Sequence, residues 1–299
     1  IKAYLFSLKP VHAMPPENDM SFPFNQRYLM RFWNALYNPA QRYQPNIDRA
    51  PTWNRGAYLT EALGHCGECH TPRTLLQGLD ANKKFEGAMI EGWKAYNMTS
   101  DQRSGIGNWS DEQLENYLST GHAEGRSTAA GPMSLVLNNS LRFLTKDDIR
   151  AMAEYLKTVP PLHNQADLAV AQKRVSATPS EARARSPRGP SPNDEDLGLR
   201  VFEGACASCH DWDGSGVHSP YADLTGNRTV NDPSGVNMTQ VILQGASLQT
   251  RQGEMFMPAF GTGYSNTEIA AVVNYVTGLF GVSPSTMTPD QVAERRKKK

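Results

Sequence analysis

The sequence predicts an all-α fold with two tandem domains, and three observations support this prediction. Capped segments of helical periodicity recur along the chain, strand signals are weak throughout, and the pattern of the first half returns in the second. Residues 162–193, rich in Ala, Ser, Pro and Arg, separate the halves and predict an extended linker. The 299-residue length also fits about two domains.

Three helices are expected in the first half. One spans residues 53–63. The second spans 111–119 and begins with Ser110, the N-cap of a capping box. The third spans 146–158, is capped by Thr145, and has its apolar residues at helical spacing.

The second half repeats this scheme. A helix is expected over residues 194–203, and a capping box at Ser265 begins a helix that runs towards Gly281. Residues 283–299 are expected to form a basic C-terminal tail, because five of the last seven residues are Lys or Arg. Such a tail is usually a solvated end, and attraction to anionic lipid or to an acidic partner is the alternative.

Two short cysteine motifs carry the chemistry of the chain. Cys66-Gly67-Glu68-Cys69-His70 and Cys206-Ala207-Ser208-Cys209-His210 are both C-x-x-C-H, the attachment signature of c-type haem. The two thiols of each motif add to the vinyl groups of one porphyrin, and the histidine ligates the iron. These motifs use all four cysteines, so the sequence predicts two covalent haems and an electron-transfer role.

Other chemistries for the same cysteines remain open from the residues alone. Each C-x-x-C is compatible with half of a zinc site or with a redox dithiol, and disulfides are an alternative if no haem is attached. A single four-cysteine zinc site is disfavoured, because Cys66 and Cys206 lie 140 positions apart.

The sixth iron ligand is expected to be a methionine, because a thioether that fills the sixth coordination position favours electron transfer. In the first half, Met133 follows Gly131-Pro132 shortly before the last helix and is preferred over Met89 and Met98. In the second half, Met257 precedes Pro258 and is preferred over Met255 and Met238. The alternative for each is a packing role.

Four further residues are candidates for holding the first haem. A carbonyl near Pro72 is expected to accept the imidazole N–H of His70. Arg73, Asn97 and Trp109 are candidates for hydrogen bonds to haem propionates, although each is also compatible with an ordinary surface or core position.

Each half therefore has the order helix, C-x-x-C-H, loop, helix, Met loop, helix, which is typical of a small class I cytochrome c. The predicted cytochrome c-like domains span residues 51–161 and 194–282. Residues 3–12 also align without gaps with residues 154–163, with Tyr, Leu, Pro and His at matched positions. We therefore expect residues 1–12 to be the final helix of an earlier, missing haem domain, and residues 13–50 to be an interdomain connector. A chance match between two amphipathic helices is the alternative.

The composition excludes some classes of function. Lys plus Arg and Asp plus Glu both number 30, which does not favour nucleic-acid binding. No apolar run is long enough to span a bilayer. Haem c is attached outside the bacterial cytoplasm, so a removed leader and a periplasmic location are expected.

Several segments together resemble the multihaem cytochrome c subunits of bacterial membrane-bound dehydrogenases. These include quinoprotein alcohol dehydrogenase, gluconate, sorbitol and fructose dehydrogenases, and molybdenum aldehyde or nicotinate dehydrogenases. The matching segments are WNRGAYL from Trp53, LGHCGECHTPR from Leu63, NMTSD from Asn97, GIGNWS from Gly105, GPM ending at Met133, MPAFG from Met257, and residues 16–27.

The resemblance implies an electron-transfer subunit, not an enzyme in its own right. Its expected partners are a catalytic subunit of PQQ, flavin or molybdopterin type and a small iron–sulfur or auxiliary subunit, with ubiquinone or a terminal oxidase as acceptor. Peripheral attachment to the inner membrane is implied as well. The family typically carries three C-x-x-C-H motifs and this chain has two, which agrees with a third haem in the intact protein.

A dihaem cytochrome c peroxidase is the alternative function. Length and motif spacing fit such an enzyme. A peroxidase needs one haem with an available distal position and an acid–base group above it, whereas both halves of this chain offer a well-placed methionine.

Overall fold

The computed structural model describes residues 2–17, 19–38, 41–164, 192–216, 218–251 and 253–297, with the side chains of residues 192–196 left out. The chain divides into two compact units, Ile1–Arg42 and Tyr43–Lys299, which are described separately. Most of the linker predicted over 162–193 lies outside the described residues.

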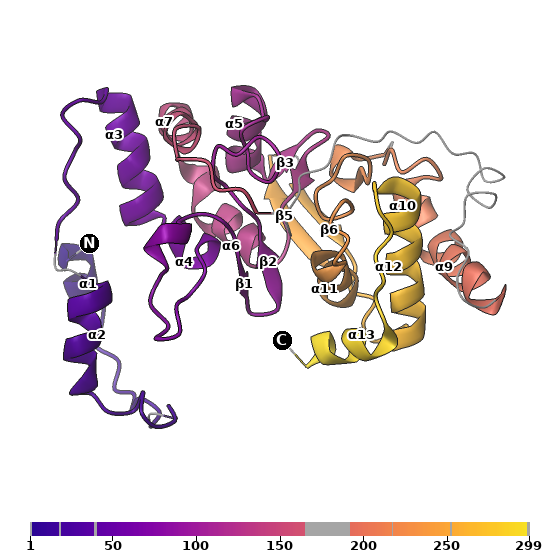
Figure 1. Cartoon of the computed structure of the whole chain (residues 1–299), viewed down its shortest axis with the longest axis horizontal. Helices are drawn as coiled ribbons and strands as arrows, with labels where there is room; N and C mark the ends of the chain where they lie inside the picture. Colours follow the sequence, from indigo (N-terminus) through magenta and orange to yellow (C-terminus); the bar gives the residue numbers. More distant parts are fainter. Residues whose placement is uncertain are drawn as a thin grey trace. The chain divides into compact units, whose positions relative to one another are not determined.

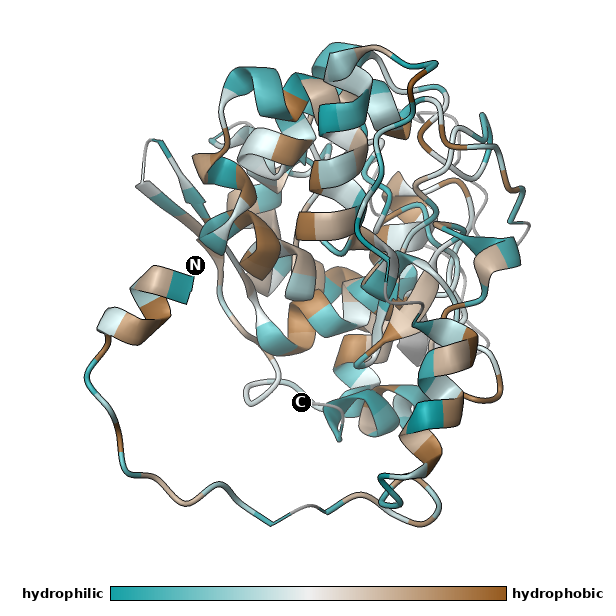
Figure 2. Ribbon diagram, turned by 90° about the vertical axis from the view of Figure 1, so that its left-hand side faces the viewer, coloured by the Kyte–Doolittle hydropathy of each residue, from teal (hydrophilic) through white to brown (hydrophobic). Residues whose placement is uncertain are grey.

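The first unit has two helices and no described residue in it is buried. They are α1 (Lys2–Ser7) and α2 (Leu29–Tyr37). α1 falls inside the segment predicted as the end of an earlier domain, and Figure 2 shows both hydrophobic and hydrophilic residues on this helix beside the N-terminus. Large apolar side chains such as Phe6, Phe22 and Phe32 are exposed.

The second unit contains two apolar cores, which define two lobes (Figure 1). We call residues 43–164 the N-lobe and residues 192–297 the C-lobe. The N-lobe elements are α3 (Pro51–Ala57), the π-helical turn η1 (Tyr58–Leu63), α4 (Cys66–His70), η2 (Ala81–Lys83), β1 (Ala88–Ile90), β2 (Trp93–Ala95), α5 (Asp111–Thr120), β3 (His122–Ala123), β4 (Ser127–Thr128), α6 (Pro132–Asn139), η3 (Leu141–Phe143) and α7 (Lys146–Leu156).

The caps predicted for the N-lobe helices are present. The Ser110 side chain accepts from the backbone N–H of Gln113, and the Gln113 side chain completes the capping box of α5. The Thr145 hydroxyl accepts from the N–H of Asp148 and begins α7. Because these bonds join residues three positions apart, local sequence is sufficient to predict them.

The first and last helices of the N-lobe cross at a glycine. α3 packs on α7, and a Cβ built on Gly56 would lie 1.9 Å from the backbone oxygen of Ala151. Only a residue without a side chain allows this approach. The crossing encloses a core that includes Leu59, Met152 and Leu156.

The C-lobe is built on the same crossing. α9 packs on α12, and a Cβ on Gly198 would lie 2.5 Å from the Ala271 backbone oxygen. The capping box at Ser265 begins α12, as predicted. The elements are α9 (Pro192–Ala205), α10 (Ala207–His210), η5 (Pro220–Ala222), α11 (Val236–Gln244), β5 (Ala246–Thr250), β6 (Gly253–Met257), α12 (Asn266–Phe280) and α13 (Pro289–Arg296).

The C-terminal residues differ from the predicted solvated tail. α13 packs against α12, and both Val292 and Met287 are buried in the C-lobe core. Arg296 donates to the backbone oxygens of Gly261 and Tyr264, and Arg295 donates to the oxygen of Gly92. Two basic residues of the predicted solvated tail are therefore hydrogen-bonded within the fold, because α13 places them beside these backbone carbonyls.

In the part of the chain that the structure describes, three short antiparallel hairpins are a second difference from the all-α prediction. The fold is mostly α-helical. The hairpin of β5 and β6 lies between the lobes (Figure 1). Its Leu248, 4% exposed, packs in the N-lobe core. The Asn138 side chain on α6 also pairs with the backbone of Ser247 and Gln249. This hairpin therefore joins the two lobes.

None of the helices in the described ranges combines the length and apolarity that a membrane span requires.

Candidate haem sites

The two thiols of the first motif lie on one short helix. Cys66 and Cys69 are the first and fourth residues of α4, and positions three apart lie on the same helix face. His65, in the left-handed conformation with φ of 49°, directs the chain into this helix. Burial raises the pKa of the Cys66 thiol to about 11. A raised pKa disfavours the free thiolate that a redox dithiol uses.

His70 is oriented by a carbonyl from another part of the N-lobe. Its Nδ1 lies 2.7 Å from the backbone oxygen of Tyr96. A carbonyl only accepts, so Nδ1 carries the proton and Nε2 keeps its lone pair for a metal. The predicted acceptor near Pro72 is wrong, because the N–H of the imidazole donates to the Tyr96 oxygen instead.

One cavity brings together most of the residues predicted for the first site. It is lined by Cys66, Cys69, His70, Asn97, Trp109 and Met133. Most of the remaining lining residues are apolar, including Leu118 and Met152. Two thiols, an imidazole whose Nδ1 carries the proton and a largely apolar enclosure fit a covalently bound haem.

Met133 and Met98 both line this cavity, whereas Met89 is 54% exposed on β1. Met133 is in the first turn of α6 and not in a loop as predicted. A Cβ on Gly131 would lie 2.5 Å from the Trp93 ring, which explains the glycine in this segment. Met98 lies two residues after Tyr96, whose backbone oxygen accepts a hydrogen bond from His70. Met98 therefore belongs to the segment that orients His70.

The three predicted propionate residues differ in their surroundings. Asn97, 1% exposed, donates to Ser104 and to the Leu162 oxygen and accepts from Thr99, which indicates a structural role. Trp109 is buried at the cavity wall. Arg73 does not line the cavity and forms a 2.6 Å ion pair with Glu68 at the surface.

The second motif has the same arrangement in the C-lobe. Cys206 directly precedes α10, and burial raises the pKa of its thiol to about 11. His210 Nδ1 lies 2.6 Å from the backbone oxygen of Ala222, so its Nε2 is likewise available to a metal. Burial lowers the pKa of His210 and favours the neutral ring. Cys209 completes the motif at the exposed end of α10.

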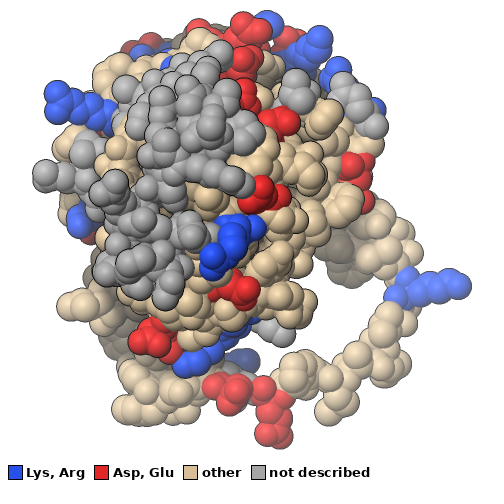
Figure 3. All heavy atoms as spheres, turned by 90° about the vertical axis from the view of Figure 1, so that its right-hand side faces the viewer, with Lys and Arg blue, Asp and Glu red and all other residues tan. Residues whose placement is uncertain are grey.

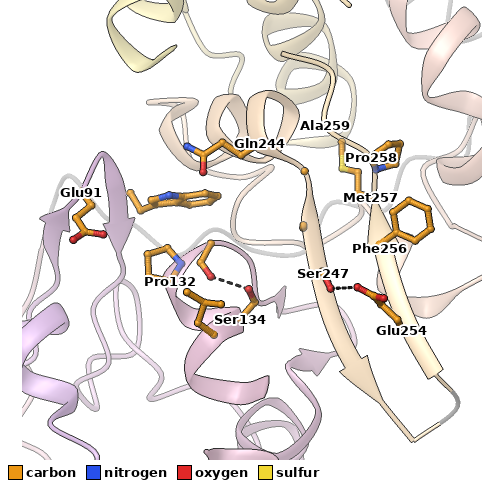
Figure 4. A pocket seen from close by; sticks show the side chains of 15 residues that line it. Glu91, Pro132, Ser134, Gln244, Ser247, Glu254, Phe256, Met257, Pro258 and Ala259 are labelled. Atoms are coloured by element: carbon orange, nitrogen blue, oxygen red, sulfur yellow. Dashed lines mark hydrogen bonds between the residues drawn. The ribbon is translucent and has the colours of Figure 1, made fainter. Parts of the chain in front are cut away.

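Met257 is the last residue of β6 and not part of a loop as predicted. It lines a groove between the lobes together with Trp93, Pro132 and Phe256, and this lining does not include Cys206 or His210 (Figure 4). Met238 is buried in the C-lobe core, in agreement with its expected packing role. The role of Met257 as a ligand stays a prediction.

The residues that orient the two histidines cannot be identified from the sequence alone. The acceptors at Tyr96 and Ala222 are backbone oxygens, 26 and 12 residues beyond the histidine each one holds. A backbone acceptor leaves no signature in residue types, because every residue has a carbonyl. Only the fold identifies it.

Among the described residues, no three His, Cys, Asp or Glu side chains gather as a cluster that could hold a metal ion. The four cysteines lie in two separate motifs in the two lobes. This arrangement does not support the alternative of a shared zinc site.

Comparison with known proteins agrees with this geometry. A family model described as cytochrome c matches residues 196–280, the C-lobe from α9 to the end of α12. The fructose dehydrogenase cytochrome subunit of Gluconobacter japonicus is 36% identical over 98% of this chain. The gluconate 2-dehydrogenase cytochrome c subunit of Pantoea cypripedii is 30% identical, also over 98%.

A third relative, one of the subunits of nicotinate dehydrogenase from Pseudomonas putida, is 36% identical over 93% of this chain. The chain spans only part of these proteins: 63% of the fructose dehydrogenase protein, 67% of the gluconate dehydrogenase protein and 22% of the nicotinate dehydrogenase protein.

Proposed function

Because this chain belongs to the family of cytochrome c subunits of dehydrogenases, we propose that it carries electrons away from a catalytic dehydrogenase subunit. Ubiquinone or a terminal oxidase is the proposed acceptor. The names of the relatives support a sugar, sugar-acid or aromatic-acid dehydrogenase as the partner class. A periplasmic location with peripheral membrane attachment belongs to the same proposal.

The observation that carries this proposal is the matched orientation of the two motif histidines. Nδ1 of each lies 2.6–2.7 Å from a backbone oxygen, so each Nε2 is directed to act as a ligand. A haem c bound at each site supplies one-electron chemistry. Cys66 and Cys69 would hold one haem, and Cys206 and Cys209 the other.

Met133 and Met257 are the proposed sixth ligands, and the structure supports Met133 more directly. Met133 lines the cavity of Cys66 and His70 from α6, a different element from the segment that holds His70. Met133 would therefore supply a thioether to a haem held at Cys66, Cys69 and His70. A thioether there favours electron transfer over binding of small molecules.

We propose a cytochrome c domain over residues 51–161 and a second over 194–282, extended by α13. Each has its own apolar core, motif and glycine helix crossing. The earlier haem domain, inferred from the match between residues 3–12 and 154–163, remains a prediction.

Surface charge is compatible with a protein partner. The C-lobe face in Figure 3 carries Lys, Arg, Asp and Glu side chains side by side. Mixed charge of this kind does not favour nucleic acid.

Haem counting tests the proposal. The pyridine haemochrome assay on the whole chain, matured with its cytochrome c assembly machinery, is expected to give two covalent haems. Replacing Cys66 and Cys69 by Ser should leave one, and replacing Cys206 and Cys209 should also leave one. A chain without covalent haem would contradict the proposal.

Co-purification from detergent-solubilised membranes then identifies the partner. The expected result is a catalytic subunit whose substrate reduces the haem absorption bands of the complex. Rapid hydrogen peroxide turnover by the isolated, reduced protein would instead favour the peroxidase alternative.

A further inference from the structure

The cavity of the first site crosses the boundary between the lobes. Its lining includes Arg228, Thr229 and Asn237, which all belong to the C-lobe. A cytochrome c domain ordinarily encloses its haem with its own chain. The first site is therefore completed by residues more than 150 positions beyond His70.

Asn237 binds the segment that holds His70. Its side-chain oxygen accepts from the Lys94 N–H at 2.8 Å, and its side-chain nitrogen donates to the Lys94 oxygen at 2.9 Å. These bonds occupy both backbone groups of one residue on β2, as a neighbouring strand would. Tyr96, whose oxygen accepts from His70, follows two residues later.

Arg228 is held at this boundary by several contacts. Its Nη2 donates to the Ser104 oxygen at 2.6 Å, and its guanidinium lies 4.6 Å from the centre of the Tyr96 ring. The backbone N–H of Arg228 donates to the backbone oxygen of Arg126 at 2.8 Å. Gly226, with φ of 70°, allows this loop to approach Gly125 closely, since a Cβ there would lie 2.9 Å from the Gly125 oxygen. The cation at the cavity is thus fixed by the lobe contact.

The other cation at this cavity is already committed to a carboxylate. The Lys94 ammonium lies 3.3 Å from Asp232, whose side chain is 3% exposed. Arg228 lines the same cavity and has a planar guanidinium with five N–H donors. A guanidinium on the wall of a mostly apolar cavity favours an anionic group inside it.

We propose that the C-lobe completes the first haem site, with Arg228 binding a propionate of the haem attached at Cys66 and Cys69. The propionates are the anionic groups of haem, and Arg228 is the C-lobe cation that lines the cavity. This inference rests on the proposed haem sites and adds a ligand from the other lobe. Redox properties of the first haem then depend on the contact between the lobes.

Arg228→Gln in the whole chain with both haems tests this role. A nearby cation stabilises the reduced, more negative haem, so its loss should lower the potential of the first haem. We expect the equilibrium constant for its reduction to fall about tenfold, which equals about 59 mV for one electron. The second haem should stay unchanged. Spectroelectrochemical titration measures both potentials, and Met133→His, which changes one axial ligand, identifies the first haem.

The pH profile separates an electrostatic role from a structural one. Without the cation the propionate pKa should rise, so the potential of the first haem should increase as the pH falls from 8 to 5. Arg228→Lys keeps the charge. The equilibrium constant for reduction of its first haem should therefore stay within about twofold of that of the unmodified protein, without this pH dependence. Arg200→Gln, an exposed arginine on α9, is the matched control and should change neither haem.

Three results would overturn the inference: an unchanged first haem in Arg228→Gln, equal shifts of both haems, or the same behaviour in the Lys and Gln variants. If Arg228→Gln fails to retain its first haem, the potential of the first haem in Arg228→Lys decides. Lysine keeps the positive charge but not the planar guanidinium, so an unchanged potential supports the electrostatic role and a lowered potential contradicts it. Absence of the first haem from the unmodified protein would instead contradict the proposed function.

Discussion

Asp148 shows how a single carboxylate links the two crossing helices of the N-lobe. Its side chain lies 2.7 Å from Nε of Arg55 on α3, and this hydrogen bond holds the pKa of Asp148 below its usual value. A lowered pKa stabilises the folded state above the ordinary value of 3.8, and this stabilisation is lost as the pH falls through the folded-state pKa.

We therefore expect Asp148→Asn to lower the free energy of unfolding by about 0.5–1 kcal/mol at pH 7, the range of a partly exposed pair. The difference should shrink as the pH falls below about 4. Denaturant unfolding at pH 7 and pH 3 measures it. Asp147→Asn, at a 92% exposed side chain on the same helix turn, is the control. A loss that is independent of pH would exclude the ionic explanation.

Met133 and Met98 are distinguished at the same scale, since both line the first cavity. Met133→Ala should remove the thioether-to-iron charge-transfer band of one oxidised haem and allow its reduced form to bind carbon monoxide. Absorption spectra of the oxidised and carbon monoxide-treated protein measure this change. Met98→Leu should leave the band intact, and the opposite pattern would transfer the ligand role to Met98.

At the scale of elements, the glycine crossings determine how closely the first and last helices of each lobe pack. Gly198→Ala should destabilise the C-lobe by about 1–3 kcal/mol, because the new methyl group meets the Ala271 backbone. On the same helix, a Cβ built on Gly204 would meet no atom within 4 Å. Gly204→Ala should therefore be neutral or stabilising by up to about 1 kcal/mol. Thermal unfolding of the holoprotein compares them, and equal effects of the two substitutions would argue against the close crossing.

At the scale of the whole molecule, the β5–β6 hairpin holds the lobes together. Leu248 extends from the C-lobe into the N-lobe core, so Leu248→Ala should cost about 2–4 kcal/mol and lower the N-lobe unfolding midpoint by roughly 5–10 °C. Phe256→Ala, on the same hairpin at a 71% exposed residue, should change the midpoint little. Calorimetry measures both, and a Leu248→Ala midpoint equal to that of the unmodified protein would show that the hairpin does not couple the lobes.

The sequence by itself determined the local features of this protein. The C-x-x-C-H motifs predict covalent haem, and the caps at Ser110, Thr145 and Ser265 begin α5, α7 and α12 where predicted, because all of these depend on residues within five positions. The resemblance to dehydrogenase cytochrome c subunits is confirmed by relatives that align over most of the chain.

The tertiary structure decided what holds each site in place. The carbonyls of Tyr96 and Ala222, the burial of α13 and the place of Arg228 at the first cavity depend on contacts between segments distant in sequence. Backbone acceptors carry no residue signature. A charged side chain such as Arg228 has the same sequence pattern at the surface and at a cavity, and only the packing of one lobe on the other distinguishes them.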